Sequence, residues 1–314
     1  MNGAEGMGSA FVITWLSASL ALAGPVLLAA LGEIFAERGG VLNVGIEGTM
    51  LLGALASFLA SYYTGMIWTS LFFAVLVGLV ANVFLAWMYV TVSASQVVAG
   101  LVFNVLALGI ASTVYRRALG DSAVPESIAM FHPLHIPVIS SLPLIGPALF
   151  GQTILFYLTL LLAFVAHFIL FRTNFGLALR ASGENPAAAD SAGISVHRMR
   201  YAGTLISGAA AGMAGGYLVL ARVGLFRESI VSGQGFIALG IVIFGRWNPL
   251  KAAGAALVFG ACDALQLSLQ IFGTRVPSQL LLALPYVVTI LAISGLFGGK
   301  AVQPAALMAP YVKD

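Results

Sequence analysis

The sequence predicts an all-α membrane protein, a polytopic helical bundle of about nine transmembrane helices (about eight to ten), some of them short or broken. Hydrophobic residues make up 60% of the 314 residues, and charged residues make up only 8%. The mean hydropathy of +1.02 is far above the range of soluble globular proteins. Several apolar runs reach the roughly 20 residues that cross a hydrocarbon core about 30 Å thick. We therefore treat residues 1–314 as a single transmembrane domain.

Apolar runs separated by polar or glycine-rich breaks predict the spans in order. The expected spans are 9–31, 41–60, 66–92, 95–115, 149–171, 199–221, 235–245, 249–271 and 277–297. The run 149–171 contains no charged residue. The run 235–245 is too short to cross a membrane alone, unless the VSGQ residues before it extend it.

The basic residues predict the side on which each loop lies, because cytoplasmic loops carry an excess of Lys and Arg. If the polar segment 172–200 is cytoplasmic, alternation of the spans places nine of the 14 Lys and Arg residues inside. The amino terminus is then outside and the carboxyl terminus inside. The longest external loop is 116–148.

The external loop contains two histidines three residues apart, a spacing that could indicate a metal site. Pro133 separates His132 from His135 and breaks any helix there, and no acid or cysteine completes a ligand set. We expect no metal. A structured loop that meets an external partner is the favoured interpretation.

The segment 172–200 predicts a short capped helix between two apolar runs. Asn185 is a good N-cap, Pro186 suits the first turn, and Gly193 stands where a left-handed residue would end the helix. Packing within a membrane gives no reason to specify a two-turn surface helix so firmly. A docking surface for a soluble partner is the better explanation.

A glycine pair at 39–40 predicts a polar break between the first two expected helices. Asn43 and Glu47 follow it four residues apart, on one face of the next expected helix. One interpretation is an ion pair of Glu47 or Glu37 with Arg38 that holds the bend. The other is a polar lining on a transport route, as in discontinuous transporter helices. Both can hold at once.

The region 233–266 repeats this layout: a short apolar helix, a Gly-Arg-Trp-Asn-Pro break, and a helix rich in small residues. It suggests an internal repeat. Asp263 and Gln266 lie on one polar stripe, explained either by hydrogen bonds between helices or by a water-accessible surface, which we favour for Asp263. The candidate translocation pathway comprises Asn43, Glu47, Asn104, Asp263 and Gln266. Asn104 is also an isolated amide of the kind that joins helices.

Gly208, Gly212 and Gly216 repeat every four residues in the sixth expected span. Such a small-residue face permits close helix approach, so we assign these glycines to bundle packing.

Missing motifs narrow the class of protein. The sequence has no G-x-x-x-x-G-K-[ST] phosphate loop, no H-E-x-x-H pair, no G-x-S-x-G elbow and no C-x-x-C pair. The chain therefore has neither an ATP site of its own nor a recognisable catalytic set. A multi-span protein with a cytoplasmic docking helix suggests transport driven by a separate motor.

Three blocks, ERGGVLNVGIEGTMLLGA, GLALRASGENPAAADSAGI and FIALGIVIFGRWNPLKAAGAALVFGACDALQ, together resemble the permease subunits of bacterial ABC importers. The resemblance covers 28–297 and is to the branched-chain amino acid/ribose permease superfamily. It is nearest the simple-sugar and nucleoside branch, and within that branch to the shorter permease of a heterodimeric pair. In this superfamily the second block is a cytoplasmic coupling loop whose short helix fits a groove on the ATPase. The resemblance assigns ATPase coupling to Arg180, Gly183, Glu184, Asn185, Pro186, Ala188, Asp190, Gly193 and Ile194.

The resemblance implies a non-enzymatic subunit of the bacterial plasma membrane that imports nucleosides or related small polar solutes by alternating access. The implied partners are an ATPase that binds ATP and Mg²⁺, a second related permease, a substrate-binding lipoprotein and the lipid bilayer. This chain is expected to bind no cofactor, metal or nucleic acid. Two alternatives are the same machinery acting on simple sugars or branched-chain amino acids, and a self-sufficient secondary transporter or channel.

Overall fold

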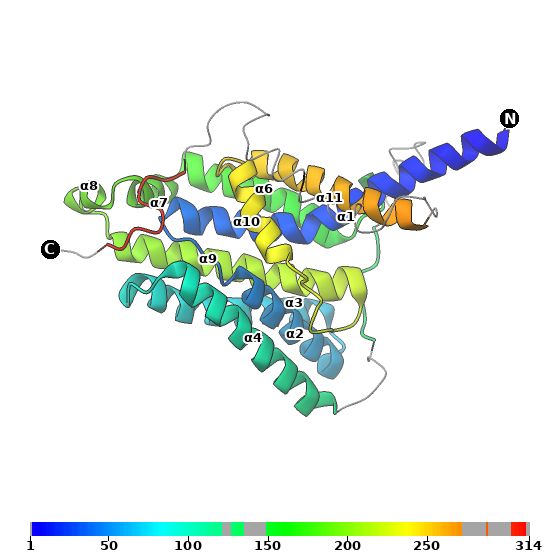
Figure 1. Cartoon of the computed structure of the whole chain (residues 1–314), viewed down its shortest axis with the longest axis horizontal. Helices are drawn as coiled ribbons and strands as arrows, with labels where there is room; N and C mark the ends of the chain where they lie inside the picture. Colours follow the sequence, from blue (N-terminus) through cyan, green and yellow to red (C-terminus); the bar gives the residue numbers. More distant parts are fainter. Residues whose placement is uncertain (1, 121–126, 135–148, 272–286, 288–302, 312–314) are drawn as a thin grey trace.

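The computed structural model describes residues 2–120, 127–134, 149–271, 287 and 303–311 (Figure 1). Its helices are α1 (Asn2–Arg38), α2 (Ile46–Thr64), α3 (Ile67–Ala86), α4 (Gln96–Leu119), α6 (Ile154–Arg172), α7 (Asn174–Glu184), α8 (Pro186–Ser191), α9 (Val196–Tyr217), α10 (Gln234–Phe244) and α11 (Pro249–Ile271). Two π-helical segments, η1 (Trp87–Thr91) and η2 (Leu218–Val223), continue α3 and α9.

Six helices in the described ranges are long and apolar enough to cross a membrane. They are Phe11–Arg38, Ile67–Thr91, Gln96–Leu119, Ile154–Arg172, Val196–Val223 and Pro249–Leu269, and each overlaps one expected span. The second expected span is the helix α2, which is not among the six, and the seventh is the short α10. The ninth, 277–297, lies outside the described residues except for residue 287. The expected number of about nine helices is therefore not confirmed.

The first helix continues beyond its expected end at residue 31 and stops at Arg38, where Gly40 adopts a φ of +91°. The extension carries Glu33 and Glu37 into the bundle, where their exposed fractions are 0% and 2%. Both carboxylates have hydrogen-bond donors there, which is the condition for burying such groups.

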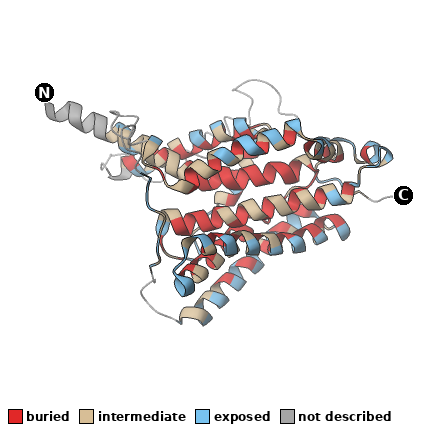
Figure 2. Ribbon diagram, turned by 180° about the vertical axis from the view of Figure 1, so that it is seen from behind, coloured by how far each residue is buried: buried red, intermediate tan, exposed pale blue. Residues whose placement is uncertain are grey.

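The core of the bundle is formed by α1 and α9, which lie side by side (Figure 2). On its other faces α1 packs against α6, α10 and α11, whereas α9 packs against α2 and α3. Both central helices have long buried stretches, and the outer helices bury one face each. In α4 the buried face is a single stripe of Gln96, Gly100, Phe103, Ala107 and Ala111.

The glycines of α9 lie against α2 and α3. A Cβ atom on Gly212 would lie 2.2 Å from the carbonyl oxygen of Ala74 in α3. On the other side, a Cβ atom on Gly53 of α2 would lie 2.4 Å from the carbonyl oxygen of Gly212. Gly216 is also close, because its Cβ atom would lie 2.8 Å from that of Ala74. Only glycine permits this separation, so backbone packs directly on backbone.

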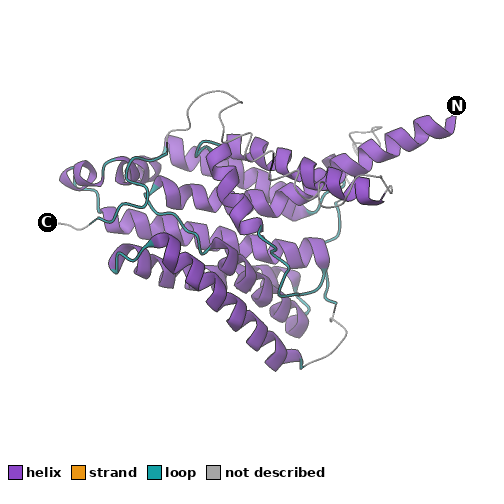
Figure 3. Ribbon diagram, in the orientation of Figure 1, coloured by secondary structure: helices purple, strands orange, loops and turns teal. Residues whose placement is uncertain are grey.

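Two of the irregular segments matter for the site: residues 39–45 between α1 and α2, here called the first break, and residues 245–248 between α10 and α11, here called the second break (Figure 3). No strand is present in the described ranges, where the β-structure is a single bridge between Pro133 and Thr153. At one end of the bundle, α7, α8 and residues 303–311 gather around the end of α1 and the start of α9 (Figure 1). The carboxyl end of α4 lies at the opposite end.

Candidate functional site

The segment 172–200 contains two helices, α7 and α8, where the sequence predicted one. The helix α7 was not predicted, and both packing and a local cap hold it. Leu179 is fully buried, and a Cβ atom on Gly176 would lie 2.2 Å from the carbonyl oxygen of Ile169 in the preceding helix. The Thr173 hydroxyl also accepts a hydrogen bond from the Gly176 N–H group at 3.1 Å, which caps the first turn.

The helix α8 begins and ends at the residues that the sequence indicated. The Asn185 side chain accepts a hydrogen bond from the N–H group of Ala188 at 3.0 Å, and Pro186 opens the first turn. Gly193 has a φ of +81°, and its N–H group donates to the Asp190 carbonyl at 2.8 Å. These caps fix a short helix whose residues 187 and 188 are exposed at the end of the bundle (Figure 1).

The carboxyl end of α7 is attached to the end of α1. Arg38 lies 3.9 Å from a Glu184 carboxylate oxygen and donates from Nε to the Trp247 carbonyl at 3.1 Å. Arg180 and Arg38 both lie over the Phe171 ring, at 5.0 Å and 5.9 Å from its centroid. The acidic partner of Arg38 in this arrangement is thus Glu184, and the hypothesis of an ion pair with Glu47 or Glu37 is wrong.

Gly183 makes the closest approach between α7 and α1. A Cβ atom there would lie 2.2 Å from the Arg38 carbonyl oxygen and 3.0 Å from the Gly40 nitrogen. Any larger side chain would separate the two elements, so α7 packs directly on the backbone of the break that follows α1.

That break positions a buried polar network, which we define as Glu33, Thr49, Asn82, Ser207 and Asn43. The amide nitrogen of Asn43 donates to Asn82 at 2.7 Å and to Ser207 at 3.1 Å. Glu33 accepts from the Asn43 backbone N–H group at 2.8 Å and from the Ser207 hydroxyl at 2.7 Å. Asn82 also donates to Thr49 at 3.0 Å. All five residues have an exposed fraction of 0%.

Asn43 lies in the irregular segment and Glu47 in the first turn of α2, so they do not share a helix face as predicted. The tight break after α1 displaces the helix start to Ile46. Asn104 holds this break from α4, accepting from the Gly48 N–H group at 2.8 Å and donating to the Val44 carbonyl at 3.0 Å. In this state Asn104 therefore joins helices.

Glu47 lies at the amino end of α10. Its two carboxylate oxygens accept hydrogen bonds from the N–H groups of Gly233 and Gly235, both at 2.7 Å. At the other end of α10, the Trp247 indole N–H group donates to Glu37 at 2.5 Å. Acidic residues before and after the first break thus hold both ends of the short α10.

Asp263 and Gln266 lie half-buried on α11, away from the polar network. A Cβ atom on Gly260 would lie 2.3 Å from the Ser19 carbonyl, which places this part of α11 beside the first half of α1. Ser19 precedes Glu33 by about 20 Å of helix at 1.5 Å per residue. The structure therefore does not bring the five predicted pathway residues into one site.

Sequence reasoning missed Glu33 and Ser207 as parts of these polar contacts, and it offered Arg38 instead of Trp247 as the partner of Glu37. Glu33 and Glu37 are one turn apart in an apolar run, and this spacing could have indicated a polar face on α1. No sequence pattern connects them to Asn82 or Ser207. His135 lies outside the described residues, and in the described ranges no group of three His, Cys, Asp or Glu residues could hold a metal.

A helical bundle with membrane-length apolar helices, polar breaks and a capped helix exposed at one end has the architecture of a membrane permease. The chain belongs to the family described as the permease component of the branched-chain amino acid transport system, whose model matches residues 15–293.

Curated relatives match over most of the chain. It is 40% identical to NupQ, a guanosine ABC transporter permease of Bacillus subtilis, over 94% of this chain and 95% of the relative. It is 33% identical to TsgC13 of Haloferax volcanii, provisionally named a glucose ABC transporter permease, over 97% and 99%. NupP, a second guanosine permease of B. subtilis, is 26% identical over 81% and 74%. No solved structure matches.

The chain is thus a permease subunit of an ABC transporter and not itself an enzyme. Membership of this family implies an ATPase partner and a substrate-binding protein. The family and the six apolar helices agree with the predicted multi-pass location in the bacterial membrane.

Proposed function

We propose that this permease imports nucleosides or related small polar solutes by alternating access, driven by an ATPase that docks on α8. The docking proposal rests on α8 itself, a helix that is capped at both ends and exposed at the end of the bundle. Its exposed side chains at 187 and 188 are methyl groups, so it offers a narrow, rigid ridge that fits a groove. ATP and Mg²⁺ are held by the partner and not by this chain.

The proposed coupling residues divide into three tasks. Asn185, Pro186 and Gly193 shape α8, and Ala188, Asp190 and Ile194 complete its surface and exit. Gly183 and Glu184 connect α7 to the end of α1, and Arg180 lies over the Phe171 ring of α6. A force on α8 is therefore delivered to the break that positions Asn43.

The proposed pathway has two levels. Asn43, Glu47 and Asn104 lie near the first break, whereas Asp263 and Gln266 lie beside the opposite half of α1. In alternating access, polar groups line the route on both sides of the place where it is closed. In this proposal the route is closed at the polar network, whose residues have an exposed fraction of 0%. Rearrangement of the break would exchange hydrogen bonds within the network for bonds to solute or water.

Nucleosides are the proposed cargo because NupQ, 40% identical along nearly the whole chain, is named a guanosine permease. A simple sugar is the second candidate, supported by the naming of TsgC13 as a glucose permease. Amide and hydroxyl side chains near the break suit both classes, since both present several hydroxyl groups and nucleosides add the hydrogen-bonding groups of the base.

A heterodimer with a second, related permease is proposed, because the chain resembles two different guanosine permeases of one organism, NupQ and NupP. A substrate-binding lipoprotein would deliver solute to the external face. The exposed apolar side chains of α3 and α4, including Phe72, Val102 and Val105, face lipid or that second permease.

The test is transport in proteoliposomes that contain ATP inside and the complex of this permease, the second permease, the ATPase and the substrate-binding lipoprotein. We expect ATP-dependent uptake of a radiolabelled nucleoside, and about tenfold lower uptake when Asn185→Ala and Pro186→Gly remove the start of α8. The matched control is Asn248→Ala, which removes a comparable cap from α11 that bonds the N–H group of Leu250 at 3.0 Å. ATP-independent uptake by this chain alone would contradict the proposal and indicate a secondary transporter. Uptake of glucose but not of nucleosides would show that the substrate is a sugar.

A further inference from the structure

The carboxyl-terminal segment 303–311, here called the strap, crosses the end of the bundle that carries α8 (Figure 1). The N–H group of Ala306 donates to the Gly183 carbonyl of α7 at 2.9 Å. The N–H group of Met308 donates to the Gly40 carbonyl in the first break at 3.1 Å. The strap is thus bonded to both elements that the coupling route must connect.

Arg200 attaches the same strap to α9. This arginine has an exposed fraction of only 2%, and its Nη1 atom donates to the Ala309 carbonyl at 2.8 Å. Among the described residues, its Nε and Nη2 atoms have no hydrogen-bond partner. Burying a guanidinium with so few hydrogen-bond partners costs free energy. Arg200 can therefore exchange its bond to Ala309 for other partners if the strap moves.

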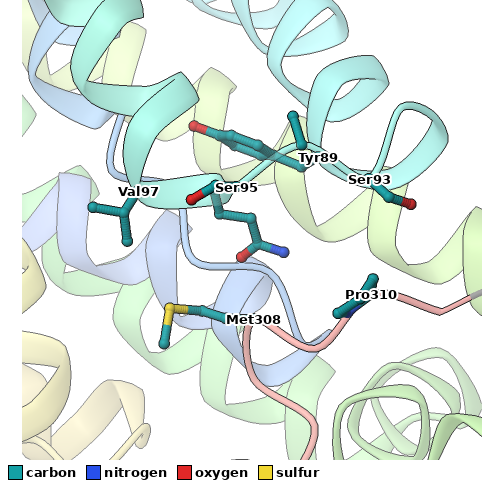
Figure 4. Close-up of a pocket in the computed structure, with 8 residues that line it drawn as sticks. Tyr89, Ser93, Ser95, Val97, Met308 and Pro310 are labelled. Carbon is teal, nitrogen blue, oxygen red and sulfur yellow. The ribbon is translucent and has the colours of Figure 1, made fainter.

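The other side of the strap forms a wall of a pocket of about 150 Å³ (Figure 4). Met308 and Pro310 lie across this pocket from Tyr89, and Gln96 also lines it. Tyr89 donates its hydroxyl to Asn43 at 3.5 Å, and Gln96 accepts from the N–H group of Leu42 at 2.8 Å. The strap therefore lies beside residues that contact the first break directly.

We propose that the strap clamps α7, the first break and α9 into one moving unit, with Arg200 as its positioning residue. This inference rests on the proposed function, because it takes α8 as the helix that the ATPase moves. Gly183 already joins α7 to the break through direct contact, and the strap adds α9, which carries Ser207 of the polar network. Ser207 already bonds Asn43 directly, so the strap adds a second connection between α9 and the first break.

The first experiment compares Arg200→Ala with Arg198→Ala in the reconstituted complex. Arg198 is an exposed arginine on the same helix, so it controls for loss of charge. We expect Arg200→Ala to keep ATPase association and basal ATP hydrolysis, but to lower receptor-stimulated hydrolysis and uptake about tenfold. We expect Arg198→Ala to behave as the unmodified chain. A second variant, Ala306→Pro, removes the N–H donor to Gly183 and leaves Arg200 in place.

If Ala306→Pro and the unmodified complex show equal receptor-stimulated ATP hydrolysis and equal uptake, the inference is overturned. This result decides the question even if Arg200→Ala fails to assemble. The Asn185→Ala, Pro186→Gly variant separates this failure from failure of the proposed function. If that variant is uncoupled and the strap variants are not, only the strap inference fails. If neither is uncoupled, the docking proposal fails.

The second experiment measures movement of the strap. Cys262 is the only cysteine in the sequence, so Cys262→Ser with Met308→Cys gives one thiol on the strap, at a position that is 46% exposed. We expect its rate of modification by a maleimide to differ between the nucleotide-free complex and the complex trapped with ATP and vanadate. We also expect Arg200→Ala to remove that difference. Equal rates in the two states of the unmodified complex would show that the strap does not move with the ATPase and would overturn the inference.

Discussion

Glu47 caps α10 by accepting a hydrogen bond from the N–H group of Gly235 at 2.7 Å, although the two residues are 188 positions apart. The helix α10 has 11 residues and spans about 16 Å, roughly half of a hydrocarbon core. A half-length helix leaves unpaired N–H groups at membrane depth, and Glu47 satisfies two of them. The first break of the chain therefore stabilises the second.

Glu47→Ala should destabilise the protein, because it removes both acceptors from the amino end of α10. We expect a loss of about 1–2 kcal/mol, the upper range for an N-cap. The control is Glu228→Ala, which removes an exposed ion pair with Arg116 at 3.6 Å and should change stability little. Thermal unfolding of the purified permease in detergent measures both. Equal melting temperatures for the two variants would contradict the capping role.

Gly212→Ala should separate α9 from α3, since the added methyl group would lie 2.2 Å from the Ala74 carbonyl oxygen. We expect a clear loss of thermal stability and of assembled complex. Gly109→Ala is the control, because nothing in the described chain lies within 4 Å of its Cβ position and alanine favours helix. The packing account fails if both alanine variants are equally stable.

Ser207→Ala should be more harmful than Ser57→Ala, although both serines have an exposed fraction of 0%. The Ser207 hydroxyl bonds Glu33 and Asn43 from two other elements, whereas the Ser57 hydroxyl bonds only the Ala54 carbonyl of its own helix. Leaving buried polar partners unsatisfied costs about 1–3 kcal/mol. Melting temperature and ATP-driven uptake are the measurements, and a larger effect of Ser57→Ala would argue against the network.

The limits of α8 could be predicted from the sequence because its signals are local. Asn185, Pro186 and Gly193 act on backbone groups within four residues of themselves. The class of protein was equally accessible, since hydropathy is a property of composition. The helix α7 was missed, although its buried residues Gly176, Leu179 and Gly183 recur at helical spacing.

The candidate pathway was predicted less well for the same physical reason. A helical face was expected to carry both Asn43 and Glu47, but residues 39–45 are held in an irregular conformation by long-range partners such as Glu33 and Asn104. The partners of Arg38 were also chosen by closeness in sequence, whereas Glu184 approaches it from α7. Tertiary contacts therefore decided the details that local patterns left open.

The most direct test of the central claim places a photoreactive amino acid at Ala187 on α8 and illuminates the assembled transporter. Ala187 is exposed at the end of the bundle, and the docking account predicts a covalent product that contains the ATPase. The same amino acid at Thr64, the last residue of α2, provides the comparison. A product with the ATPase from position 187 and none from position 64 is the predicted result. Capture of the ATPase from position 64 and not from position 187 would contradict the claim.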